Sequence, residues 1–209
     1  MSDVCRALHE WTNTLALHRF PYDEKTIPSD GVYILFQLSE ESHGTHRIVR
    51  VGTHTGDNQL RSRLWQHFLN ENKDRSIFRK NIGRCLLNKE KDPYLEKWEW
   101  DLTTRAAKEK YRSQIDSEKQ RMLEKKITDY LQQNFSFVVL NVPEKEVRLD
   151  LESKMLSTLA QCDECIPSTA WLGNFSPQIK IRENGLWNVQ GIDKSPLTIE
   201  ELVQLTKTR

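Results

Sequence analysis

Two strand-like runs joined by a short polar connection constrain the fold of this chain more than any other feature. The first run, Gly31–Leu38, is almost continuously apolar, which is typical of a strand covered on both faces. The second, Arg47–Thr53, is rich in β-branched residues, and the segment 39–46 is polar and contains a glycine. We therefore expect a β-hairpin inside a layer of helices.

The remaining elements follow from hydrophobic periodicity. A third strand is expected at 135–142, where Pro143 ends it, and 76–87 reads as a short helix or a loop. Asp150 is the expected N-cap of the helix that follows the third strand. Apolar residues at helical spacing predict helices at 4–17, 60–70, 150–161 and 199–207, and the charged stretch 92–134 is also helical in pattern.

With 209 residues, the chain has the length of one domain carrying an insertion. The expected fold class is α+β: a small three-stranded sheet, mixed or antiparallel, flanked by helices and interrupted by a helical insertion. We divide the chain into an N-terminal helical part (1–29), a core (30–87 and 135–175), the insertion (88–134) and a C-terminal wrap (176–209).

The formal net charge of +1 gives no overall field toward nucleic acid, so DNA binding would need a local basic face. The N-terminus shows no signal or transit pattern, and no apolar stretch approaches ~18 residues. We expect a cytoplasmic protein without membrane contact.

The presence of four cysteines does not by itself indicate a metal site. Cys162 and Cys165 have the spacing of a metal clip, but a second pair is missing, because Cys5 and Cys85 are isolated in the sequence. Reduced thiols are the favoured interpretation over a zinc site.

Glu152 lies at helical spacing with Met155, Leu156 and Leu159, so its carboxylate shares the apolar stripe of its own helix. A charge buried there needs a cation, which can be an arginine, a lysine or a metal. The alternatives are an ordinary salt bridge and a glutamate at the edge of the stripe that faces water.

Three further residues indicate a function only when they are considered together: Tyr33, Arg63 and His67. A strand tyrosine is usually part of the core, and Arg63 and His67, four residues apart on one helix, are usually a solvated flank. However, Gly31-Val32-Tyr33, then Arg50-Val51-Gly52, then Arg63-x-x-x-His67 resemble the GIY-YIG nuclease superfamily. The resemblance covers residues 30–70 well and 135–175 loosely, and it assigns Glu152 as the metal-binding glutamate and Asn174 as the late asparagine.

The resemblance implies a DNA endonuclease that uses a single divalent ion, Mg²⁺ or Mn²⁺, held by Glu152. Tyr33 would be the general base and His67 its hydrogen-bond partner, while Arg63 would clamp phosphate oxygens and Asn174 would orient Glu152 or a substrate oxygen. A restriction or host-defence role is the first expectation within this class.

One position departs from the family pattern. Arg50 stands where the family has its second tyrosine, and we interpret this as variation, with His54 as a polar ring that could replace the missing phenol. The change leaves a second hypothesis open, a catalytically inactive nucleic-acid-binding module with a nuclease fold.

A basic stretch follows the helix of Arg63 and His67 and could track a DNA backbone, although a solvated surface is the competing interpretation. The charged arm has the i,i+4 pairing of a solvent-facing helix and could equally form a homodimer contact or serve a scaffold protein. The candidate DNA-binding residues are Lys73, Arg75, Arg79, Lys80 and Arg84.

Overall fold

The computed structural model describes residues 2–207 and is built on one antiparallel sheet. Its strand order is β1-β4-β2-β3. This confirms the α+β class but adds one strand to the three predicted, because β1 has only two residues and is too short to show periodicity. The strands are β1 (His18–Arg19), β2 (Gly31–Ser42), β3 (Thr45–Gly52) and β4 (Phe135–Asn141).

The predicted hairpin is formed by β2 and β3, with Tyr33 opposite Gly52 and Leu35 opposite Arg50. Phe36 pairs with Ile48, so the register shifts by one residue at this point. Because Arg50 is paired directly with Leu35, its side chain lies on the face that Tyr33 and Leu35 share. The bulge turns the next residue, Val49, toward the same face.

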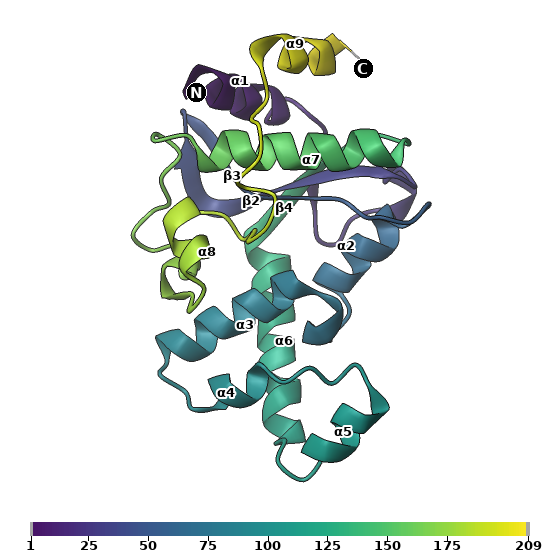
Figure 1. The fold of residues 1–209 in the computed structure, drawn as a ribbon, viewed down its shortest axis with the longest axis vertical. Coiled ribbons are helices and arrows are strands. Elements are labelled where there is room, and N and C mark those ends of the chain that lie inside the picture. Colours follow the sequence, from purple (N-terminus) through teal and green to yellow (C-terminus); the bar gives the residue numbers. More distant parts are fainter. Residues whose placement is uncertain (1, 208–209) are drawn as a thin grey trace.

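Helices cover both faces of the sheet (Figure 1). On one face, α1 (Ser2–Thr12) and α7 (Lys145–Ala160) pack against β2 and β3, and α9 (Ile199–Lys207) packs on α1. On the other face lie α2 (Leu60–Phe68), α3 (Ile77–Lys89) and α6 (Ser117–Asn134). Alternate residues of β2 divide between two buried clusters, with Tyr33 and Leu35 in one and Val32 and Ile34 in the other.

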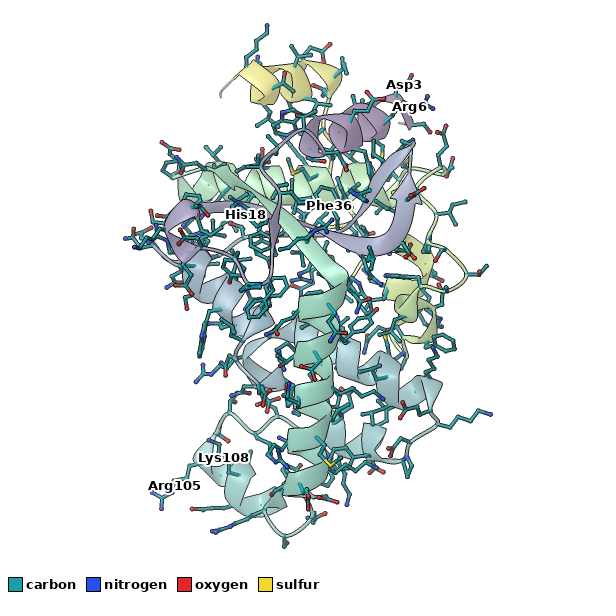
Figure 2. The ribbon with its side chains drawn as sticks, turned by 180° about the vertical axis from the view of Figure 1, so that it is seen from behind. Asp3, Arg6, His18, Phe36, Arg105 and Lys108 are labelled. Atoms are coloured by element: carbon teal, nitrogen blue, oxygen red, sulfur yellow. The ribbon has the colours of Figure 1, made fainter. Side chains whose placement is uncertain are left out.

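Residues 88–134, the predicted insertion, form an arm that projects away from the sheet (Figure 1). It contains α4 (Tyr94–Trp98), α5 (Arg105–Tyr111) and α6, and α6 passes directly into β4 at Phe135. Arg105 and Lys108 lie at its outer end (Figure 2). Among residues 2–207, no helix combines the length and the apolar composition needed to cross a bilayer.

After α7 the chain forms a 3-10 turn, η3 (Leu172–Phe175), at the end of the core part and a short helix, α8 (Ile179–Asn184), in the C-terminal wrap. Trp171 and Trp187 are buried, and both indole N–H groups donate to Oε1 of Gln37, at 3.1 and 3.2 Å. The tryptophans are therefore core residues. Two further 3-10 turns, η1 (Glu24–Thr26) and η2 (Lys73–Arg75), lie in connections.

Two predicted helix boundaries were wrong. The first helix ends at Thr12, and the rest of the N-terminal part holds β1 and η1. Helix α7 begins at Lys145 with Glu144 as its N-cap, so Asp150 is an interior residue. Glu152 therefore lies in mid-helix, and the positive helix N-terminus contributes nothing to its stabilisation.

Candidate active site

A buried tyrosine–histidine pair is the first part of the site. Tyr33 and His67 are both fully buried, and the Tyr33 hydroxyl lies 2.8 Å from Nε2 of His67. The other ring nitrogen, Nδ1, lies 2.7 Å from Oγ of Ser76, which caps α3. The strand and two helices thus hold the phenol and the imidazole in a fixed orientation.

The environment of His67 keeps its ring neutral. Burial lowers its pKa well below the usual value, and the positive charges of Arg63, Arg50 and Arg79 lower the pKa further. A neutral imidazole can share a hydrogen bond with a phenol without taking its proton. His67 can therefore fix the orientation of the Tyr33 hydroxyl.

Glu152 enters the site from α7, which packs against β3. Its apolar neighbours Met155, Leu156 and Leu159 are buried, as the stripe predicted, while Glu152 itself is partly exposed. Burial raises the pKa of the Glu152 carboxyl above its ordinary value. The pKa is lowered by Arg50, by the backbone N–H of Thr53 and by Arg63, but these effects do not outweigh the effect of burial.

The carboxylate of Glu152 opens onto a cleft of about 550 Å³. Arg50 and Arg63 line the same cleft, so a half-buried carboxylate and two guanidinium groups share one cavity. Tyr33 lies against Gly52 at the end of β3 and is hydrogen-bonded to His67, which is close enough to Arg50 and Arg63 to feel their charges. The lining residues are Arg50, Arg63, Ile77, Asn81, Glu152, Ser153, Leu156 and the segment 187–191.

The two arginines are fixed differently. The guanidinium of Arg50 lies 5.0 Å from the centre of the Phe78 ring, and its Nη1 donates to the carbonyl oxygen of Trp187 at 3.1 Å. Arg63 is less constrained, because the bonds that hold it, to Gln66 and to the carbonyl oxygen of Arg75, both come from Nη1. Arg50 is thus a fixed positive charge and Arg63 a more adaptable one.

Comparison with known families tests the resemblance that the sequence motifs suggested. The family model of the GIY-YIG domain matches residues 6–207, nearly the whole chain. This chain belongs to the GIY-YIG family. Membership indicates a nuclease in general terms. Searches of curated proteins and of solved structures gave no match.

Steric contacts explain two glycines of the GIY-YIG motifs in this chain. A Cβ at position 52 would overlap the hydroxyl and ring carbons of Tyr33, and a Cβ at position 31 would overlap the carbonyl oxygen of Leu140. Glycine at 52 therefore lets the buried phenol lie against the strand end. The glycine at 31 lets β2 and β4 approach closely.

Two asparagines in the cleft of this GIY-YIG domain were missed from the sequence. Asn81 is fully buried, its Oδ1 accepts from Arg84, and its Nδ2 has no hydrogen-bond partner within residues 2–207. Nε of Arg50 is similarly unpartnered among the described residues. Asn188 exchanges two hydrogen bonds with the backbone of Val51. A polar residue on the apolar stripe of α3 was a usable signal for Asn81, whereas the irregular segment around Asn188 offered none.

The structure places His54 and Asn174 outside the cleft. Both ring nitrogens of His54 bind backbone groups, Nε2 accepting from the N–H of Gly31 and Nδ1 bonding the carbonyl oxygen of Gly56. Asn174 donates to the carbonyl oxygens of Ser168 and Thr169, within its own turn. His54 therefore fixes a loop, and the asparagines in the cleft are Asn81 and Asn188, not Asn174.

Most of the basic stretch is used inside the fold. Lys73, Arg79 and Arg84 are buried, and each is ion-paired, to Asp74, Glu124 and Glu99 respectively. Lys80 donates to the carbonyl oxygen of Glu99. Of the five predicted DNA-binding residues, only Arg75 is exposed.

Proposed function

We propose that this chain is a divalent-metal-dependent endonuclease that hydrolyses DNA phosphodiesters in the cleft of Glu152. The observation that carries the proposal is the composition of that cleft. It combines one desolvated carboxylate, two guanidinium groups and two buried N–H donors, on Arg50 and Asn81, that have no hydrogen-bond partner among residues 2–207. Anion-binding donors beside a carboxylate whose burial the nearby arginines do not offset suit a phosphate and a metal ion together.

Glu152 fits a hard divalent cation. The two arginines do not offset its burial, so a cation at the carboxylate would relieve the remaining cost. A single carboxylate supports Mg²⁺ or Mn²⁺, because these ions keep several waters and use substrate phosphates as further ligands. When bound, the ion would polarise a phosphoryl oxygen and stabilise the leaving 3′ oxygen.

The protein's own groups would supply the rest of the chemistry. Arg63 would bind the scissile phosphate through two nitrogens, while Nε of Arg50 and Nδ2 of Asn81 would each donate to a phosphate oxygen. In its ionised form, Tyr33 would take the proton of the attacking water, and the neutral ring of His67 would orient the Tyr33 oxygen by a hydrogen bond. The side chain of Tyr33 is fully buried. Catalytic contacts of this kind are commonly completed only when substrate binds.

The test is cleavage of supercoiled plasmid with Mg²⁺ or Mn²⁺ by the wild type and by Glu152→Gln. Glu146→Gln is the matched control, because Glu146 is an exposed carboxylate on the same helix. We expect cutting by the wild type and by the control, and none by Glu152→Gln. A wild type that neither cuts nor binds DNA at low salt would contradict the proposal.

A second candidate is an inactive DNA-binding descendant of the nuclease fold. It is favoured by Arg50 at the position of the family's second tyrosine and by the complete burial of Tyr33. It predicts DNA affinity that falls steeply with salt and no cutting by any variant.

Within the nuclease class, we propose a restriction or host-defence role. It predicts discrete fragments from unmodified DNA. A continuous smear would indicate cutting without sequence preference.

A further inference from the structure

A second cluster of chemically reactive side chains lies outside the cleft. Cys5 comes from α1, His43 from the β2–β3 turn, and Cys162 and Cys165 from the loop that follows α7. All four side chains are buried, with exposed fractions of 0%, 1%, 7% and 5% for Cys5, His43, Cys162 and Cys165. Three segments that are far apart in the sequence therefore bring three free thiols and an imidazole together.

The contacts within the cluster join all four groups. The thiol of Cys5 interacts with those of Cys162 and Cys165. Sγ of Cys162 lies 3.6 Å from Nε2 of His43, and the ligand atoms of Cys5, His9 and His43 all lie within 4.8 Å of one another. The missing second half of the clip is thus supplied by Cys5 and His43.

The separation of Cys162 and His43 fits a tetrahedral zinc ion. Zinc–sulfur bonds of ~2.3 Å and zinc–nitrogen bonds of ~2.0–2.1 Å at tetrahedral angles place a sulfur and a nitrogen ligand about 3.5 Å apart. The distance from Sγ of Cys162 to Nε2 of His43 is 3.6 Å.

His9 is adjacent but is committed to the backbone. Its Nδ1 lies 2.9 Å from the carbonyl oxygen of Cys5, and its Nε2 accepts from the N–H of Ile48 at 3.1 Å. Nε2 also lies 3.8 Å from Sγ of Cys165. A ligand role would cost His9 the hydrogen bond from Ile48, so His9 is better suited to a supporting position beside the thiols.

His43 has the surroundings of a metal ligand. Its Nε2 faces Cys162, while its Nδ1 lies 3.4 Å from a carboxylate oxygen of Glu164. A carboxylate on the far nitrogen of a histidine is the usual orienting partner in zinc sites. The turn also holds His43 at φ = 53°, a left-handed backbone that costs energy in a non-glycine residue.

We propose that Cys5, His43, Cys162 and Cys165 bind one structural zinc ion. Four protein ligands close the coordination sphere, which is the pattern of structural and not catalytic zinc. Binding replaces three thiol protons by the metal. The ion would tie α1, the hairpin turn and the end of α7 together, and the proposal is independent of the nuclease chemistry.

The first test is the metal content of the full-length chain, purified under reducing conditions and dialysed against buffer without metal. We expect one zinc per chain by elemental mass spectrometry. Replacement by Co²⁺ should give the visible bands of tetrahedral cobalt with thiolate charge transfer. A folded chain that takes up neither Zn²⁺ nor Co²⁺, or one whose thiols are joined as a disulfide, would overturn the proposal.

Substitutions then identify the ligands. Cys162→Ser and His43→Asn should lose zinc, whereas Cys85→Ser, which removes a buried cysteine of α3 outside the cluster, should retain it. His9→Gln should also retain zinc, and the reverse result for the two histidines would refute this ligand set. Glu164→Gln should weaken binding about 10–100-fold. If a ligand variant does not fold, the cobalt spectrum of the wild type still reports the thiolates, and a spectrum without thiolate charge transfer would count against the site.

Discussion

Replacement of Arg79 by methionine should destabilise the protein strongly and leave its DNA-binding surface unchanged. Arg79 is fully buried and its guanidinium makes five hydrogen bonds, to the side chain and carbonyl oxygen of Glu124, to Thr128 and to the carbonyl oxygen of His67. Arg79→Met leaves Glu124 as a buried charge without its ion pair. Breaking such a pair costs about 3–5 kcal/mol.

The assay is urea unfolding at two pH values, supported by thermal melts. A loss of 3–5 kcal/mol corresponds to roughly 6–20 °C in Tm for a chain of this size. Burial raises the pKa of Glu124, and removal of Arg79 raises it further. The ionised carboxylate is then penalised above its folded pKa, so the deficit of the variant should shrink as the pH falls from ~8 toward the unfolded value of ~4.3.

Two variants control the argument. In Arg79→Met/Glu124→Gln, the uncharged amide can still accept from the N–H of Lys73, so most of the lost stability should return. Arg75→Met changes an exposed side chain and should alter stability by less than ~0.5 kcal/mol. An Arg79→Met protein that is as stable as the wild type but binds DNA more weakly would refute the reasoning.

Three further predictions concern the cleft and the tyrosine–histidine pair. Without divalent metal, Glu152→Gln should be more stable than the wild type at pH ~8, because burial raises the pKa of the folded carboxyl and so penalises its ionised form. The difference should vanish below the unfolded pKa of ~4.3. Urea titrations in EDTA at both pH values measure this difference, and a difference independent of pH would contradict the prediction. Tyr33→Phe should cost about 1–3 kcal/mol in the same assay, since it leaves Nε2 of His67 without its partner, and it should abolish plasmid cutting even where the variant is fully folded. Gly52→Ala should cost about 1–3 kcal/mol, because the new methyl group overlaps a phenol that cannot move aside; an unchanged Tm would show that the strand end can yield.

Local patterns were sufficient for much of the fold. The apolar run of β2 and the β-branched residues of β3 predicted the hairpin, and helical spacing predicted α2 and α9. The start of α7 was missed because Arg148 occupies its buried face, where a charged side chain conceals the stripe. Its guanidinium donates to the carbonyl oxygens of Pro143, His54 and Gly56, and these contacts are visible only in the folded chain.

The site was predictable to a similar extent. The spacing of Glu152 with its apolar neighbours indicated a half-buried carboxylate, and the structure places it beside Arg50 and Arg63. The basic stretch was misleading, because the acidic partners Glu124 and Glu99 come from the arm and cannot be paired with it by sequence alone. The cysteine cluster was hidden for the same reason, since Cys162 and Cys165 follow Cys5 and His43 by more than a hundred residues.

The direct passage of α6 into β4 couples the arm mechanically to the sheet. At 1.5 Å per residue, its 18 residues span ~27 Å, and no flexible hinge separates the last helical residue from Phe135. In β4, Val139 is paired with Tyr33, so a twist applied to the distal end of α6 acts on the strand next to the buried phenol. A molecule that binds the outer end of the arm would therefore apply a torque to the sheet itself.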